Sequence, residues 1–282
     1  MHWNIDPVFL DLGFIQLRYY GMFYALGIGV AFSLVTRFMK AEGLSDDDAT
    51  WLLVHIVVGL ILGAHWVHMA FYEPENFFTW RFFQLGTGLA SHGGGAGMIL
   101  ARWLFVRNRS VPYFQIGDML AVAGAFPAAC IRFGNFFNSE IVGHPTDLPW
   151  GIVFERIDDQ ARHPSQLYEG IFLLLFFPVM LFLYKTQKDK RHHGWFAALF
   201  FVVYFSFRFF IEQFKSIQSS MMNDLSLLTM GQWLSIPIVL FFGVMLYITW
   251  NAKPGEKNVA ATATAPEKPQ APRKKKGKRR SR

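Results

Sequence analysis

A run of polar side chains at the end of an apolar segment is the part of the sequence best suited to chemistry. Residues 131–143 read I-R-F-G-N-F-F-N-S-E-I-V-G and follow a stretch with almost no charge. The run supplies a guanidinium, two amides and a carboxylate, from Arg132, Asn135, Asn138 and Glu140. If the segment stays helical, Arg132 and Asn135 share a face, and Asn138 falls near them. Such donors suit a phosphate or another oxyanion. The simpler alternative is an arginine that ends the helix and reaches toward lipid headgroups.

The elements that must position this run are membrane helices. The chain has 282 residues, is 52% hydrophobic and contains 31 Phe, and its apolar residues come in long blocks rather than amphipathic stripes. This composition indicates a polytopic membrane protein rather than a soluble domain. Seven apolar segments can be marked, at about residues 18–38, 50–71, 88–106, 114–136, 166–184, 194–214 and 230–250. The sequence therefore predicts an all-α membrane protein with about seven transmembrane helices.

Basic residues predict the orientation of these helices. Lys and Arg gather in the loops after the first, third and fifth segments and in the C-terminal tail, and they are sparse in the intervening loops. By the positive-inside rule, the N-terminus is expected outside and the C-terminus in the cytoplasm. We expect a membrane domain over residues 1–252 and a disordered basic tail over 253–282, with no nucleic-acid partner. The first residues lack a basic n-region, so no cleavable signal peptide is predicted.

The longest loop expected to face outward lies near residues 138–165. Pro145, Pro149 and Gly151 mark turns, and the piece P-W-G-I-V-F predicts a short extended segment. Pro164 is expected in the first turn of the fifth helix. Polar residues fill the next turn and a half: Ser165, Gln166, Tyr168 and Glu169. A polar cap of this kind predicts a site at the outer side of the bilayer.

Further polar groups lie inside the apolar segments, where ionisable side chains usually face a cavity or a partner. His92 is followed by three glycines, which leave the backbone open beside an imidazole that can transfer protons near neutral pH. A packing histidine is the alternative. Arg208 and Glu212 are four residues apart, so an ion pair within one helix is expected, and its arginine could also hold a phosphate. Tyr20 begins the first segment and either joins an interfacial aromatic belt or points its hydroxyl into the site.

Metal and thiol chemistry have little support in the sequence. The single cysteine, Cys130, excludes a disulfide framework and a Cys-based zinc site, and its apolar surroundings predict a buried small hydrophobe. His65 and His68 could share a helix face, but no H-E-x-x-H motif and no supporting carboxylate stand beside them. We therefore predict no metal site.

Taken together, the motifs resemble those of the prolipoprotein diacylglyceryl transferases of the bacterial inner membrane. The signature R-x-G-N-F-x-N-x-E-x-x-G lies at residues 132–143. Five further motifs follow the family's order along the chain: Y-G at 20–21, H-G-G at 92–94, R-H-P-S-Q-L-Y-E at 162–169, F-R-x-x-x-E at 207–212 and M-G-Q-x-L-S-I-P at 230–237.

The resemblance implies transfer of the diacylglyceryl group of phosphatidylglycerol to the lipobox cysteine thiol of an exported prolipoprotein, with release of glycerol-1-phosphate and without a cofactor. It also implies a multi-pass protein of the bacterial inner membrane whose partners are phosphatidylglycerol, the prolipoprotein signal peptide and membrane lipid. By motif matching, the catalytic residues would be Arg132, Arg208, His92 and Tyr20. The substrate-binding residues would be Asn135, Asn138, Glu140, Gly93, Gly94, His163, Gln166, Tyr168 and Glu212.

The sequence departs from the family's pattern at two positions. Ile131 replaces the glycine that usually precedes the signature arginine, and His65 stands where the second span usually carries an arginine. Because a histidine can be neutral at pH 7, a fixed positive charge is lost there. This motivates an alternative, a non-catalytic or divergent relative that binds lipid or signal peptide. A transporter is the other alternative, although no inverted repeat or pair of broken helices is visible.

Overall fold

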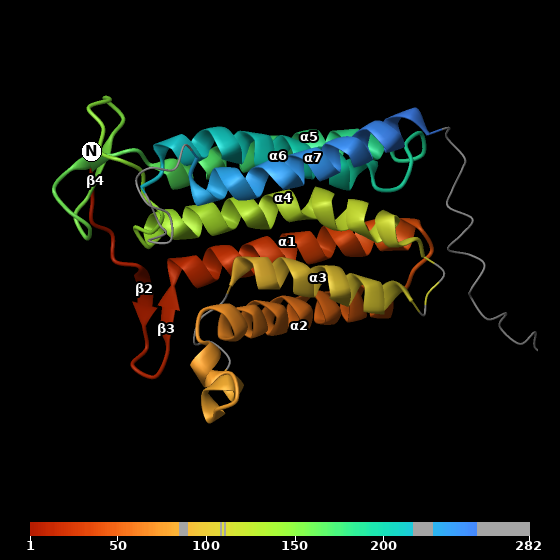
Figure 1. Cartoon of the computed structure of the whole chain (residues 1–282), viewed down its shortest axis with the longest axis horizontal. Helices are drawn as coiled ribbons and strands as arrows, with labels where there is room; N and C mark the ends of the chain where they lie inside the picture. The colour runs from red at the N-terminus through yellow and green to blue at the C-terminus, as the bar shows by residue number, and fades with distance from the viewer. Residues whose placement is uncertain (85–89, 108, 110, 217–227, 253–282) are drawn as a thin grey trace, which may run out of the picture.

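The apolar blocks of the sequence form helices that pack side by side in one bundle (Figure 1). The computed structural model describes residues 1–84, 90–107, 109, 111–216 and 228–252. The helices in this part of the chain are α1 (Tyr19–Ala41), α2 (Asp46–Phe71), α3 (Ser91–Val106), α4 (Tyr113–Phe137), α5 (Ser165–Gln187), α6 (Trp195–Ile211) and α7 (Met230–Asn251). Each overlaps one predicted segment, so the prediction of an all-α polytopic membrane protein is confirmed. Six of these helices are long and apolar enough to cross a membrane, and α3, with 16 residues, is the shorter one.

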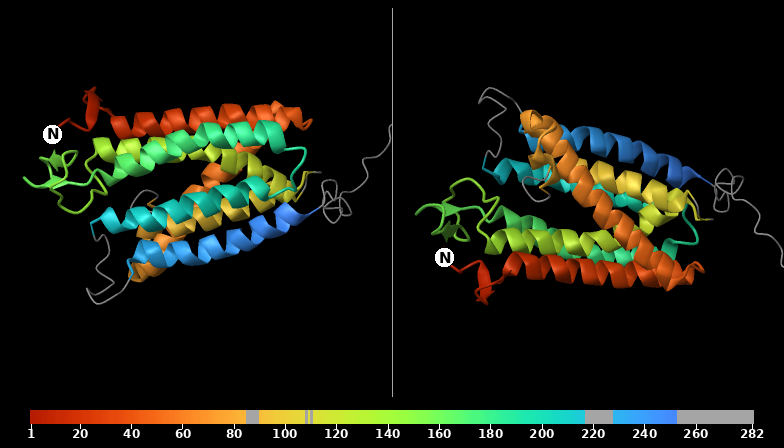
Figure 2. Two further views of the ribbon diagram at one scale, coloured as in Figure 1. Left: turned by 90° about the horizontal axis from the view of Figure 1, so that it is seen from above. Right: turned by 90° about the horizontal axis from the view of Figure 1, so that it is seen from below.

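Helix α4 is the centre of the bundle. It packs against α1, α5 and α6, and it contributes more buried residues than any other described helix. The helices α2 and α3 form a separate antiparallel pair, and α6 packs along α7. Figure 2 shows α1 and α7 on opposite sides of the bundle, with α4 between them. Cys130 lies in α4 and is only 4% exposed, which confirms its predicted burial.

Glycines allow α2 and α3 to approach at backbone contact. A Cβ on Gly97 would lie 1.9 Å from the Gly59 carbonyl oxygen, and one on Gly63 would lie 2.3 Å from the Gly93 carbonyl oxygen. Any larger residue at these positions would force the helices apart, as is typical of membrane helices that pack through small residues.

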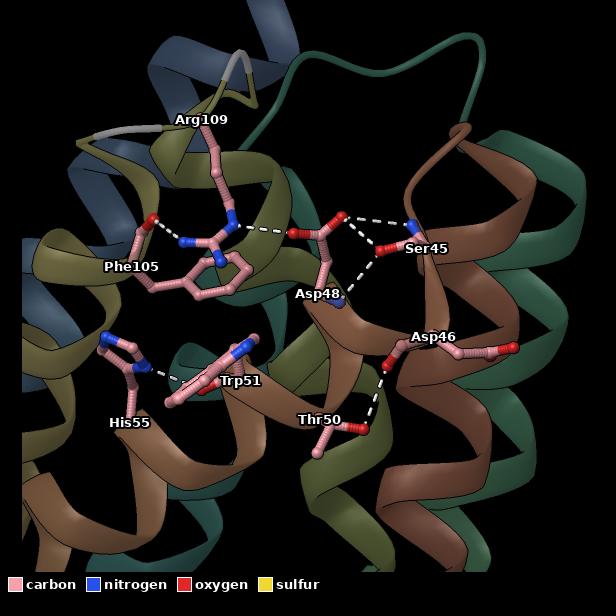
Figure 3. Close-up of polar contacts among 8 residues, drawn as sticks. All are labelled: Ser45, Asp46, Asp48, Thr50, Trp51, His55, Phe105 and Arg109. Carbon is pink, nitrogen blue, oxygen red and sulfur yellow. Dashed lines mark hydrogen bonds and ion pairs between the residues drawn. The ribbon is translucent and has the colours of Figure 1, made fainter.

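One end of the bundle, which we call the basic end, carries the loops after α1, α3 and α5. There Ser45 and Asp48 form a capping box at the start of α2, and Arg109 donates from Nε to the Asp48 carboxylate at 2.9 Å. Figure 3 shows the same guanidinium bonded to the Phe105 carbonyl oxygen and lying over the Phe105 ring. The basic loop after α3 is thereby attached to the start of α2.

Asp118 makes a second connection at the basic end. Its carboxylate accepts the backbone N–H groups of Gly194 and Ala197, at 2.7 and 2.8 Å. These amides belong to the start of α6, where a negative group offsets the unpaired N–H groups and the helix dipole. Gly194 has a φ of 97°, a left-handed conformation that favours glycine. The one charge near the start of α4 therefore fixes the position of α6.

The opposite end of the bundle carries short strands and 3₁₀ turns. The strands are β1 (His2–Trp3), β2 (Val8–Asp11), β3 (Gln16–Arg18), β4 (Ile152–Phe154) and β5 (Ala161–Arg162), and the 3₁₀ turns are η1 (Pro74–Asn76), η2 (Trp80–Phe83) and η3 (Glu212–Phe214). One sheet has the order β1-β4-β5, with β1 parallel to β4, and β2 pairs with β3 as a hairpin. The predicted extended segment is confirmed as β4. Pro164 immediately precedes α5 instead of lying in its first turn.

Candidate active site

Three charged side chains from separate segments meet at the end of the bundle that carries the short strands, opposite the basic end. Glu169, on the second turn of α5, is fully buried and forms ion pairs with Arg132 of α4 and with Lys215, which follows η3. Lys215 is itself only 5% exposed. Because burying charges is costly unless they are paired, a carboxylate between two cations is how such a cluster is kept in an apolar bundle. We call these three residues the Glu169 triad.

Further groups extend the triad toward α6. The Tyr204 hydroxyl lies 3.3 Å from an Arg132 terminal nitrogen, and a Glu212 oxygen lies 3.4 Å from the Lys215 ammonium nitrogen. Arg208 is close enough to interact electrostatically with Glu169. The two arginines predicted to cooperate therefore share this buried carboxylate as a neighbour.

The predicted ion pair between Arg208 and Glu212 is wrong for the described part of the chain. Helix α6 ends at Ile211, and Glu212 begins the 3₁₀ turn η3. The tighter turn breaks the four-residue spacing of the α-helix and places Lys215 beside Glu212 instead. Arg208 forms no ion pair with any residue that the structure describes.

The amides of the 131–143 run hold their own carboxylate. Asn135 and Asn138 donate to the two oxygens of Glu140, at 3.1 and 3.2 Å. Gln166 of α5 donates to the Glu140 backbone carbonyl at 2.6 Å. Helix α4 ends at Phe137, so Glu140 lies in the turn that follows it. The predicted group Asn135, Asn138 and Glu140 is therefore brought together, with Gln166 as a fourth member.

The amide oxygens of this group have no donor among the described residues. They are the Oδ1 atoms of Asn135 and Asn138 and the Oε1 atom of Gln166, and all three are buried. Buried polar atoms are rarely left unpaired in proteins, so these acceptors are suited to receive donors from water or from a ligand.

Tyr20 lies against the signature run. A Cβ on Gly134 would fall 2.8 Å from the Tyr20 ring, so only glycine lets α1 and α4 come this close. Tyr20 is half-buried and close enough to interact electrostatically with Glu140 and Arg132. This predicted catalytic residue is thus adjacent to the rest of the candidate site.

His92 is not brought to the triad by any contact in the described chain. Its side chain is exposed near the start of α3. Gly93 and Gly94 are buried against α2, where a Cβ would meet the Gly63 carbonyl oxygen and the Leu60 side chain, at 2.2 and 2.8 Å. Helix packing therefore accounts for these two glycines, which do not leave an open backbone beside the imidazole.

The loop before α5 packs against the segment that carries Lys215 of the triad. The backbone of Gly143 bonds to His163, and that of His144 bonds to Phe214, which directly precedes Lys215. His163 contacts the Tyr168 hydroxyl at 3.1 Å, and Tyr168 accepts a bond from Trp150. Burial and the nearby His144 lower the pKa of His163 from its usual value. His163 and Tyr168 therefore lie together, in the loop that packs beside η3.

His65 has a structural contact. It is 1% exposed, and its Nε2 lies 2.7 Å from the Phe82 carbonyl oxygen of η2. His68 lies 3.4 Å from the Glu73 carboxylate. The two histidines connect α2 to the segment that follows it. His65 therefore has a structural role, which differs from that of a phosphate-binding arginine.

Sequence reasoning did not assign a role in the site to three residues that the structure places in it. Glu169 was visible within R-H-P-S-Q-L-Y-E, and Lys215 follows Glu212 by three residues. Tyr204 lies four residues before Arg208, one turn back on the same helix, which was the available signal.

Comparisons with known proteins identify the family. The family model described as prolipoprotein diacylglyceryl transferase matches residues 7–249. The chain is 40% identical to the phosphatidylglycerol–prolipoprotein diacylglyceryl transferase of Tolumonas auensis, over 90% of this chain and 99% of that protein. It is 37% identical to the enzyme of the same name from Bacteroides fragilis, over 91% of this chain and 98% of that protein, and 35% identical to one from Legionella pneumophila, over 89% and 98%. The chain belongs to the prolipoprotein diacylglyceryl transferase family.

Proposed function

We propose that this chain transfers the diacylglyceryl group of phosphatidylglycerol to the lipobox cysteine thiol of prolipoproteins, at the outer face of the bacterial inner membrane. The thiolate sulfur would attack the glyceryl carbon that carries the phosphate. A carbon–sulfur bond forms, the carbon–oxygen bond breaks, and glycerol-1-phosphate leaves with the electron pair. The thiol proton passes to a base. The named activity of the relatives and the Glu169 triad support this proposal.

The observation that carries the proposal is the meeting of Arg132 and Lys215 at one buried carboxylate. A leaving phosphate ester gains negative charge in the transition state, and fixed cationic donors in a site that excludes water stabilise that charge well. Arg132 presents a planar fork that matches phosphate oxygens, and Arg208 adds a third cation nearby. The pairing with Glu169 holds these groups in place before the lipid arrives.

The amides around Glu140 suit the glycerol headgroup. Glycerol hydroxyls are donors, and the buried oxygens of Asn135, Asn138 and Gln166 are acceptors without partners among the described residues. If only the hydroxyls of a headgroup can donate to these buried acceptors, a lipid whose headgroup lacks hydroxyls leaves them unpaired and binds more weakly. We propose that this group selects phosphatidylglycerol.

The base is Tyr20 or His92. Only the thiolate is a good nucleophile, so one of them must accept the proton or relay it. Tyr20 is favoured by position, because it packs on Gly134 and lies close to Arg132 and Glu140. His92 is favoured by chemistry, because an imidazole can both accept and release a proton under physiological conditions.

The orientation follows from the positive-inside rule, with the N-terminus outside and the triad at the outer side. The predicted tail, residues 253–282, lies outside the described residues. In this orientation the site would face the compartment where the lipobox cysteine of an exported protein emerges.

The test is a product assay with purified protein, phosphatidylglycerol and a lipobox peptide, read as thioether mass. The unaltered chain should form product, and Arg132→Ala should form none, whereas Arg18→Ala, which removes an exposed arginine bonded to Gln16, should keep activity. Comparison of Tyr20→Phe with His92→Gln assigns the base. Absence of product while lipid or signal peptide still binds would establish the non-catalytic alternative. Absence of product and of binding, with lipid movement across vesicles, would establish a transporter.

A further inference from the structure

A polar pocket lies at the basic end, at the opposite end of α5 from Glu169. Its volume is about 120 Å³, and it opens to solvent. It forms where α1 and α5 end and where α4 and α6 begin. The polar residues that the argument uses are Glu42, Gln115, Asp118, Lys188, Arg191 and His192. The reaction at the triad uses none of them.

The loop that covers this pocket is strongly basic. Residues 185–193 read K-T-Q-K-D-K-R-H-H, with four cations, two imidazoles and one carboxylate. Three acids line the pocket, Glu42, Asp118 and Asp189, and the first two are already engaged. Glu42 pairs with Lys188 at 3.0 Å, and Asp118 accepts two backbone N–H groups of the α6 start. Asp189, the acid in the loop, is exposed and lies 3.8 Å from Lys188.

Arg191 is the cation left with capacity to bind. Its guanidinium lies 4.1 Å above the Trp250 ring and 5.0 Å from the Trp195 ring. Stacking holds the plane of the guanidinium without using its N–H groups. The Nε atom is buried and has no hydrogen-bond partner among the described residues. A buried donor of this kind is costly unless an acceptor reaches it.

We propose that this pocket binds the phosphate group of an anionic phospholipid from the leaflet at the basic end, with Arg191 as the principal donor. Phosphate oxygens suit the planar set of N–H donors of a guanidinium that lines a pocket. A lipid is the favoured source because Trp195 and Trp250 frame the arginine, and tryptophans gather at the depth of lipid headgroups. Basic pockets between membrane helices at the cytoplasmic side bind such headgroups. His192 and His193 line the same pocket. The proposal holds whether or not the chain catalyses transfer, since it concerns the other end of the bundle.

The test counts lipids bound to the full chain. The protein is taken from phosphatidylcholine nanodiscs containing phosphatidylglycerol, and the retained phosphatidylglycerol is measured by native mass spectrometry. Arg191→Ala should weaken one phosphatidylglycerol binding event by about tenfold or more, as expected for loss of a charge-assisted hydrogen bond. The same loss should appear when Arg191→Ala is added to Arg132→Ala, which separates this pocket from the triad. Lys190→Ala is the matched control, because it removes the neighbouring charge from the same loop but does not line the pocket.

A second variant covers the case in which Arg191→Ala fails to fold. Gln115→Glu places a negative charge on the α4 wall of the pocket without altering the arginine, and it should also expel the lipid. Competition with glycerol-1-phosphate and with inorganic phosphate shows whether the bound phosphate group comes from a lipid or from a soluble phosphate. If these soluble phosphates displace the lipid at millimolar concentration, the site is one for free phosphate. Equal losses in Arg191→Ala and Lys190→Ala would mean diffuse surface charge, and equal retention of phosphatidylglycerol by Arg191→Ala and the unaltered chain would refute the pocket; either result overturns the proposal.

Discussion

Replacing Glu169 with glutamine tests the triad most directly. The change keeps the size and shape of the side chain but removes the one negative charge that touches both Arg132 and Lys215. Glu169 is fully buried, and the Arg132 and Lys215 side chains are 12% and 4% exposed, so solvent screens the two cations weakly. Removal of one partner from a buried ion pair costs about 3–5 kcal/mol. Lys215 retains Glu212 at 3.4 Å, which favours the lower end, about 3 kcal/mol.

Binding of lipid should respond in the opposite direction. In the unaltered chain, a lipid phosphate must share Arg132 and Lys215 with Glu169. In Glu169→Gln the phosphate supplies the missing negative charge, so we expect phosphatidylglycerol to bind about tenfold more tightly, a gain of about 1.4 kcal/mol. The lipid should therefore raise the melting temperature of the variant more than that of the unaltered chain.

The assay is thermal unfolding in detergent across a phosphatidylglycerol titration. Glu75→Gln, an exposed glutamate at the same end of the bundle, is the matched control and should behave as the unaltered chain. The double variant Glu169→Gln with Arg132→Gln should recover part of the stability, because the cation that Glu169→Gln leaves without a carboxylate is gone. Equal lipid-dependent shifts in Glu169→Gln and the unaltered chain would refute the reasoning, because the phosphate would then bind away from the triad.

Three further predictions concern neighbouring features. A Cβ on Gly231 would lie 2.2 Å from Glu212 Oε1, so Gly231→Ala should push this carboxylate off Lys215 and lower transfer about tenfold, whereas Gly243→Ala, with nothing within 4 Å, should leave transfer unchanged in the thioether assay. Hydrogen bonds from Arg162 hold the pKa of Asp158 below its usual value, so the carboxylate stabilises the loop above the unfolded pKa near 4 and this contribution is lost as the pH falls through the lower folded pKa. Limited proteolysis should show this acid-induced loosening in the unaltered chain, and Asp158→Asn should be loosened already at neutral pH. Cys130→Ser should retain most transfer activity, because Cys130 is buried in α4 and contacts Gly27 of α1 rather than the triad; loss of product from a variant that still folds would assign the thiol a role in the reaction.

The elements of the fold were predictable because each helix has a local cause. Long apolar blocks have few alternatives to a membrane helix, since a bilayer leaves every backbone polar group to be paired within the segment. The position of β4 could be read from the turn residues around it. The start of α3 at Ser91 lies within a few residues of the predicted one, at about residue 88.

Pairings between segments are the part that the sequence could not supply. The spacing of Arg208 and Glu212 favours an ion pair only if the helix continues, and α6 ends one residue too early. Which cation then meets Glu212 depends on the geometry of η3, a tertiary feature with no motif of its own. For the same reason no role was predicted for Lys215, although it is one of the most buried cations in the described chain.

Glu169 shows that a sequence motif can predict the position of a residue on a helix without predicting which side chains it contacts. The sequence placed it correctly in the second turn of α5, in a polar cap, but a cap residue can face water or the bundle. Gly170 resolves this, because a Cβ there would lie 3.3 Å from the Arg132 Cβ, so α5 meets α4 at this level. At that contact a carboxylate on the adjacent position is buried, and a buried carboxylate needs a cation. The arginine of the signature run and the glutamate of the α5 motif therefore constrain each other, and substitution of either alone should be more damaging than loss of an exposed charge nearby.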